Sequence, residues 1–138
     1  MKIISRVENS QGRHEVTLQT TDHVHSLAIP PRSTGFGSSV NGGELLFLAL
    51  ATCYCNDIYR EAAKRGLKVD QVEVVVAGDF GAEGQAARNV TYRAKVSAHA
   101  GEAQIQELMR QTDQVAEIQN TLRLGMPVTF TGIQAVSV

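Results

Sequence analysis

The chain has 138 residues, with 13 Lys and Arg against 14 Asp and Glu, and its formal net charge is −1. A near-neutral chain without a basic run is not expected to bind nucleic acid. The longest uncharged segment is too short to span a membrane, and the N-terminus lacks the apolar core of a signal peptide. Two cysteines at positions 53 and 55 cannot form a disulfide framework, which favours the reducing cytoplasm. The length predicts a single domain over residues 1–138.

Three short strands are predicted at the start of the chain. Lys2–Glu8 and Arg13–Thr20 flank a turn at Asn9–Gly12, and the second segment alternates apolar with polar residues. A third segment, His23–Ile29, ends at a proline pair. We interpret these segments as an antiparallel meander.

The stretch Asn41–Gly66 predicts one long central helix, which follows a Gly- and Ser-rich loop over residues 33–43. Asn41 and Glu44 have the spacing of a capping box, and Gly66 is a typical C-terminal stop. Leu45–Cys55 contains no charge, so this half of the helix has few sides that suit water. We therefore expect it to be covered by a sheet or by a second subunit.

The second half of this helix is predicted to be amphipathic. At about 100° per residue, one side carries charges and the other is apolar. Cys55 then points into the apolar side, whereas Cys53 lies above Asp57 on the polar flank. A carboxylate at this position would raise the pKa of the Cys53 thiol if the two side chains met. The predicted charged side consists of Asp57, Arg60, Glu61, Lys64 and Arg65, and the apolar side of Ile58, Tyr59, Ala62 and Ala63.

Beyond Gly66 the pattern predicts two strands, a helix and a closing strand. The strands are Val69–Phe80 and Arg88–His99, the helix is Glu102–Leu124, and the last strand is Val128–Val138. The order is βββ-α-ββ-α-β, with strands and helices in separate runs, so the predicted fold class is α+β.

Two other motifs resemble ligand sites. His23 and His25 would lie on one face of a strand, a spacing that metals accept, but no third ligand is near in sequence. The segment Gly35–Gly37 lacks the spacing and the lysine of a phosphate-binding loop. We therefore predict neither a metal nor a cofactor.

The segment Asn41–Cys53, NGGELLFLALATC, resembles the central-helix stretch N-P-x-E-L-L-x-A-A-L-x-x-C of the OsmC/Ohr family of osmotically inducible and organic hydroperoxide resistance proteins. The order of elements resembles that family over nearly the whole chain. The resemblance implies an intertwined homodimer with two sites at the subunit interface. It also implies thiol chemistry, because many members reduce organic hydroperoxides.

The resemblance places Cys53 on the family's peroxidatic cysteine, and Arg13 is the candidate for the arginine that holds the thiolate and the peroxide. The family's glutamate that partners this arginine falls on Gly43 here. Glu44 is one step further along the helix, about 100° away, so it does not replace the missing carboxylate without rearrangement.

The family's resolving cysteine, in a C-P-x-S/x-x-x-L stretch, falls on Ala116 of this chain. Cys55 cannot substitute, since residues i and i+2 of a helix point about 160° apart, beyond the geometry of a disulfide. The resemblance therefore places this chain among the one-cysteine relatives, which depend on an external thiol reductant or stop at the sulfenic acid.

Three functions follow from these features. The first is a cytoplasmic homodimer that reduces organic hydroperoxides, or reacts with a related electrophile, through Cys53. The second is a non-catalytic dimer that binds a small apolar ligand at its interface, because both the resolving cysteine and the glutamate are missing. The third is a redox sensor that is oxidised without turnover.

Overall fold

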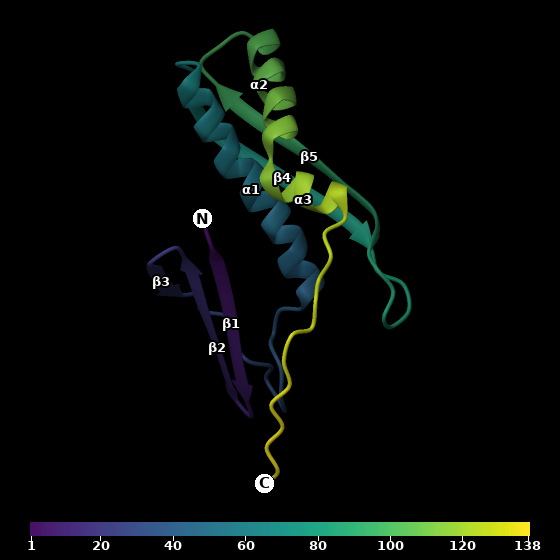
Figure 1. Ribbon diagram of the computed structural model, residues 1–138. Coiled ribbons are helices and arrows are strands. Elements are labelled where there is room, and N and C mark those ends of the chain that lie inside the picture. The colour runs from purple at the N-terminus through teal and green to yellow at the C-terminus, as the bar shows by residue number, and fades with distance from the viewer. The chain divides into compact units, whose positions relative to one another are not determined.

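A computed structural model describes all residues, 1–138, and contains five strands and three helices. The chain forms two compact units, Met1–Leu46 and Phe47–Val138. The mixture of strands and helices confirms the predicted α+β class (Figure 1).

The first unit is built on an antiparallel meander, as predicted. It consists of β1 (Ile3–Ser10), β2 (Arg13–Thr20) and β3 (His23–Ser26), in the order β1-β2-β3. Ser10 pairs with Arg13, so a two-residue turn joins the first two strands. Gly12 has a φ of 72° in this turn, a left-handed conformation that glycine adopts without strain because it has no Cβ atom.

The loop before the central helix has local contacts that define its path. Pro31 and Ser38 form an isolated antiparallel bridge. The backbone N–H of Gly37 donates to Asn9 Oδ1 over 3.0 Å, which ties the loop to the end of β1. These contacts hold the loop against the meander within the first unit.

Helix α1 (Gly42–Lys64) confirms both predicted ends. The Glu44 N–H donates to Asn41 Oδ1 over 2.8 Å, and the Asn41 N–H donates to Glu44 Oε1 over 3.2 Å, which is a reciprocal capping box. At the other end, Gly66 has a φ of 67°, and the N–H of Leu67 donates back to the carbonyl of Ala62.

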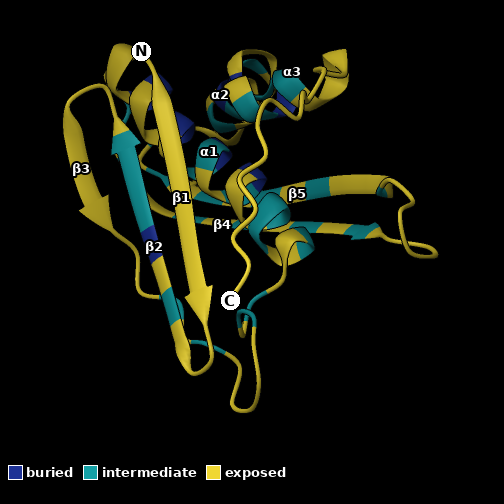
Figure 2. Ribbon diagram, turned by 60° about the horizontal axis from the view of Figure 1, so that its bottom comes forward, coloured by how far each residue is buried: buried dark blue, intermediate teal, exposed yellow.

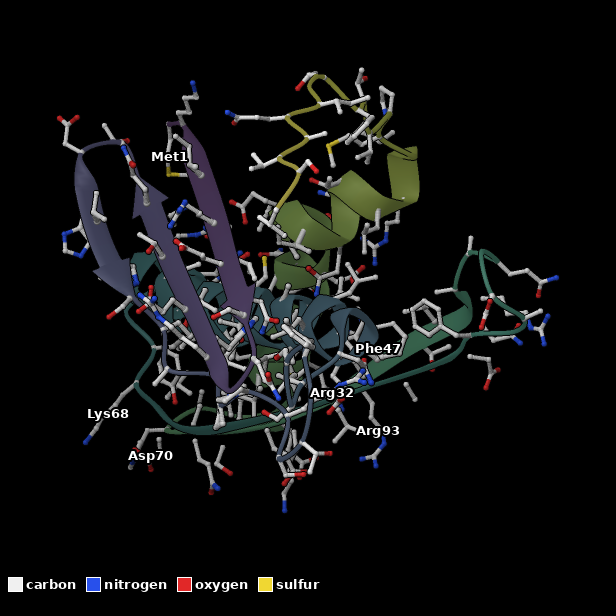
Figure 3. The ribbon with its side chains drawn as sticks, turned by 90° about the horizontal axis from the view of Figure 1, so that it is seen from below. Met1, Arg32, Phe47, Lys68, Asp70 and Arg93 are labelled. Carbon is white, nitrogen blue, oxygen red and sulfur yellow. The ribbon has the colours of Figure 1, made fainter.

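The second unit contains a long antiparallel hairpin, β4 (Val69–Asp79) and β5 (Arg88–Ala98). Alternate residues of each strand turn toward the helices, as the sequence alternation predicted, while Asp70 and Arg93 are exposed on the opposite face (Figure 3). α1 and α2 (Glu102–Val115) cover the inward face of this hairpin.

The core of the second unit lies between these helices and the hairpin. Tyr54, Ile58 and Ala62 of α1 pack with Leu108 of α2, and all four are at most 3% exposed. The ring of Tyr54 meets that of Tyr92 edge to face, and its hydroxyl donates to the carbonyl of Met109 over 2.8 Å. The dark blue segments of Figure 2 show that this buried stripe continues along α1.

The prediction of one continuous second helix is wrong, because the helix is interrupted at Ala116. Instead of one helix over 102–124, the chain forms α2 and then α3 (Glu117–Leu124), with Ala116 between them at φ −70° and ψ 108°. Ala116 is fully buried, and its extended backbone lets α3 start in a new direction. This break creates a second helix N-terminus in the middle of the predicted helix.

The predicted closing strand is also wrong. Residues 126–138 form neither helix nor strand, and Val128, Phe130 and Ile133 are more than 80% exposed. A strand needs the edge of another strand for its N–H and C=O groups, and no edge of this chain pairs with the segment. The predicted strand Val128–Val138 is therefore not formed.

None of the three helices is both long and apolar enough to cross a membrane.

Candidate functional site

Cys53 lies in the middle of α1 with its sulfur among polar groups. The thiol is half-buried, and it faces Asp57 Oδ2 at 3.5 Å and Glu117 Oε2 at 3.8 Å. Asp57 is one turn further along the same helix, whereas Glu117 is the first residue of α3. The polar flank predicted for Cys53 is confirmed, and the thiol hydrogen has two carboxylates to which it can donate.

Arg60 holds these two carboxylates together. Its Nη1 atom lies 3.0 Å from Asp57 Oδ1 and 3.0 Å from Glu117 Oε1, and its Nε lies 3.1 Å from Glu61 Oε2. The free oxygens of Asp57 and Glu117 are the ones that face Cys53. The guanidinium is therefore separated from the sulfur by one layer of carboxylates.

The predicted faces of the second half of α1 need correction. Asp57 and Glu61 are 5% and 7% exposed, although they were expected on the solvated side, and Tyr59 is 43% exposed, although it was expected inside. Glu61 is tolerated there because Lys64 and Arg65 also pair with it, at 2.9 and 3.6 Å. Three acids and three bases thus form one balanced network beside the thiol.

The start of α3 also faces the sulfur. The backbone N–H of Ile118, in the first turn of α3, lies near the sulfur and lowers the pKa of Cys53. Free N–H groups at a helix N-terminus favour an anion such as a thiolate. The break at Ala116 is what brings this terminus to the middle of α1.

Burial and the carboxylates nevertheless keep the thiol protonated. Burial is the largest cause that raises the pKa of Cys53, and the charges of Asp57 and Glu117 raise it further, while the Ile118 N–H lowers it. The balance is a thiol pKa above its ordinary value. The site therefore favours the thiol over the thiolate.

The two carboxyl groups have opposite tendencies. Burial and the hydrogen bond with Glu117 raise the pKa of Asp57, and Arg60 opposes this. The pKa of Glu117 is lowered, first by its own backbone N–H and then by Asp57 and Arg60. The pair therefore titrates together, and the first proton that the pair takes up is favoured on Asp57 rather than on Glu117.

The same cluster has the composition of a possible metal site, since one potential ligand atom from each of Cys53, Asp57 and Glu117 lies within 4.8 Å of the others. A divalent cation bound to them would face the positive charge of Arg60, which already occupies one oxygen of each carboxylate. The network is electrically balanced without a metal. This arrangement suits proton transfer better than metal binding.

The residues predicted to assist Cys53 have other partners within the first unit. Arg13 lies on β2, is largely exposed and pairs with Glu15 at 2.8 Å. Glu44 is engaged in the capping box with Asn41. A contact between Arg13 and Cys53 stays a prediction.

Cys55 points away from this cluster, as predicted. It lines a shallow pocket of about 260 Å³ together with Ala51, Thr52, Asn56 and Val74. Its half-buried thiol has no carboxylate beside it. The two cysteines therefore have separate environments, although they are two residues apart.

Sequence reasoning missed Arg60, Glu117 and Ile118 as neighbours of the thiol. Glu117 and Ile118 were placed inside a continuous helix, so no free N–H group was expected there. A signal was available in the resembling motif C-P-x-S/x-x-x-L, since proline after the cysteine is typical of the first position of a helix. The matching position here is Glu117, and α3 does begin at that residue.

Comparison with known families identifies one match. The family described as OsmC-like protein matches residues 35–131, which include α1, Cys53, both later strands and both later helices. The comparison with curated proteins gave no significant match.

Comparison with solved structures finds the same fold at low sequence identity. An OsmC-like protein from Mycoplasma pneumoniae has a TM-score of 0.58 and 16% identity, covering 87% of each chain. An organic hydroperoxide resistance protein OsmC from Legionella pneumophila has a TM-score of 0.59 and 16% identity, covering 89% of this chain and 90% of that one. An OsmC-like protein of unknown function from Vibrio cholerae has a TM-score of 0.54 and 14% identity, covering 86% and 92%.

Proposed function

Because this chain belongs to the OsmC-like protein family, we propose that it is a thiol-based redox protein that reduces organic hydroperoxides through Cys53. The observation that carries the proposal is the setting of the sulfur. It is half-buried at the junction of α1 and α3, beside an N–H donor and two carboxylates, rather than enclosed in aliphatic side chains.

In the proposed reaction the Cys53 sulfur attacks the terminal oxygen of the hydroperoxide. The O–O bond breaks, the sulfur becomes a sulfenic acid and loses two electrons, and the other fragment leaves as the alcohol after it takes up a proton. An external thiol then reduces the sulfenic acid through a mixed disulfide and releases water. The external thiol is required because Ala116 stands where a resolving cysteine would be, and Cys55 points away.

The test is consumption of cumene hydroperoxide by the purified protein in the presence of dithiothreitol. We expect turnover with the native protein and none with Cys53→Ser, while Cys55→Ser retains it. Peroxide loss no faster with protein than without, and unchanged by Cys53→Ser, would end the peroxidase proposal.

The raised pKa of Cys53 favours a second candidate, a non-catalytic dimer that binds a small apolar ligand. A third candidate is a redox sensor that is oxidised without turnover, which the free, half-buried thiol of Cys53 allows. The number of hydroperoxide molecules consumed per protein chain distinguishes these alternatives from a peroxidase. A sensor accumulates one sulfenic acid at Cys53, detected by mass spectrometry after trapping, and then stops. A purely ligand-binding protein shows no oxidation at Cys53 at all.

We further propose that the protein acts as a homodimer in the cytoplasm. Its two cysteines are free, which suits a reducing compartment. α1 exposes an apolar stripe on the side away from its buried face, in which Leu48 is 57% and Tyr59 43% exposed. A second copy of the chain is the partner that we expect to cover this stripe.

A further inference from the structure

We propose that Asp57 and Glu117 form a proton relay for Cys53, with Arg60 as the residue that positions them. This inference rests on the proposed peroxidase function and assigns residues to its proton transfers. It follows from the 3.5 and 3.8 Å contacts of the sulfur with the two carboxylates and from the bridge that Arg60 forms between them.

The proposed relay supplies the two proton transfers that the reaction needs at this site. A neutral thiol is a weak nucleophile, and an alkoxide that leaves without a proton is a poor leaving group. The Cys53 thiol donates toward Asp57, so this carboxylate is in place to accept the proton as the sulfur attacks. Arg60 bridges Asp57 and Glu117, and the two carboxyl groups shift each other's pKa, so the proton can then be held by either member of the pair.

The proton balance closes within the cluster. The S–H proton passes to the carboxylate pair, the electron pair of the broken O–O bond goes to the departing oxygen, and the pair returns a proton to that oxygen. The products are the Cys53 sulfenic acid and an alcohol, and the carboxylates end in their starting state. Ile118 contributes its N–H to the negative charge that develops on the sulfur.

The charged groups around the sulfur come from two helices. Helix α1 supplies Asp57 and Arg60, and α3 supplies Glu117. Glu61 lies on the far side of the Arg60 guanidinium, where it also pairs with Lys64 and Arg65. Gln119 of α3 is neutral and donates to the carbonyl of Leu50 over 3.0 Å. The hydrogen-bond partners of the Cys53 sulfur are the two carboxylates, and Arg60 reaches the sulfur only through them.

The experiment compares Asp57→Asn and Glu117→Gln with the native protein under single-turnover oxidation by cumene hydroperoxide at pH 6.5. The matched control is Glu107→Gln, because Glu107 is an exposed glutamate of α2 that also pairs with an arginine, at 3.7 Å, but is not part of the cluster. Circular dichroism establishes that each variant is folded. Glu117 is largely exposed, so its variant remains informative if Asp57→Asn does not fold.

A relay and a purely electrostatic role of the two carboxylates predict opposite changes in the rate of oxidation by the hydroperoxide. Loss of a neighbouring carboxylate lowers the thiol pKa, so both variants are expected to react faster with iodoacetamide, whose iodide leaves without a proton. Loss of the relay is expected to slow oxidation by the hydroperoxide by about 100-fold, with the deficit shrinking above the thiol pKa. Glu107→Gln is expected to match the native protein in both reactions.

Each outcome decides a separate question. If the native protein and Cys53→Ser behave alike, the proposed function fails. If the native protein is oxidised at Cys53 but folded Asp57→Asn and Glu117→Gln are oxidised as fast or faster at pH 6.5, the relay is overturned and the function stands. Slower oxidation together with faster alkylation supports the relay.

Discussion

At the scale of single residues, the site exerts opposing effects on the pKa of Cys53. The Ile118 N–H stabilises negative charge on Cys53, whereas burial and two carboxylates oppose it. The sequence allowed the effect of Asp57 to be predicted, because one helical turn separates it from Cys53. Glu117 is 64 positions away, and a contact across that separation depends on packing that no local pattern encodes.

Ala116 offers a direct test of the missing resolving step. It is fully buried and immediately precedes Glu117, which contacts the sulfur. We expect Ala116→Cys to form an intramolecular disulfide with Cys53 after one equivalent of cumene hydroperoxide, because a second thiol then lies beside the sulfenic acid. Mass spectrometry of the alkylated protein measures the bond.

Ala116→Ser is the control, since it has a similar volume and no thiol. A sulfenic acid that persists in Ala116→Cys, with the new thiol still free to alkylate, would contradict this placement of residue 116.

At the scale of elements, helix ends and strand alternation were predictable and their partners were not. The capping box, the Gly66 stop and the inward residues of β5 follow from spacing along the chain. The break at Ala116 carries no glycine or proline, so the apolar period of 102–124 concealed it. It is set by the packing of Ala116 and Gln119, which are both buried.

Gly78 of β4 shows how closely α1 packs on the hairpin. A Cβ atom at this position would lie 2.8 Å from Phe47 Cζ and 3.0 Å from Val90 Cγ2. We therefore expect Gly78→Ala to lower the free energy of unfolding by about 1–3 kcal/mol through overpacking. Urea denaturation followed by circular dichroism measures this change.

Gly42, the first residue of α1, has open space around it and serves as the comparison. Gly42→Ala is expected to leave stability unchanged or to raise it by up to about 1 kcal/mol, because alanine restricts the unfolded chain. Equal midpoints for the two variants would mean that Phe47 moves aside without cost.

At the scale of the whole molecule, the single chain leaves apolar groups uncovered. The stripe on α1 and the segment 126–138 are exposed to an extent that is unusual for a stable monomer. The expectation that α1 needs more cover than its own sheet supplies came from the uncharged run Leu45–Cys55, and Leu48 in that run is indeed exposed. We propose that a second copy of the chain covers it.

Sedimentation at micromolar concentration is expected to give a dimer. Leu48→Glu is expected to yield monomers, because a charge in the middle of an apolar interface is left unpaired. Val75→Glu is the control, since Val75 is an exposed valine on the outer face of β4. A native protein that sediments as a monomer, or a Leu48→Glu variant that stays dimeric, would refute this interface.

The neutral resting state of Cys53 has a consequence for the lifetime of the protein. Disulfide exchange requires a thiolate, and a raised thiol pKa keeps that form scarce. We therefore expect oxidised glutathione and other bystander disulfides to capture the sulfur slowly. Under the proposed relay, the sulfur becomes nucleophilic only beside a bound hydroperoxide, and Cys53 would then be spared from unproductive modification and remain available when peroxides accumulate.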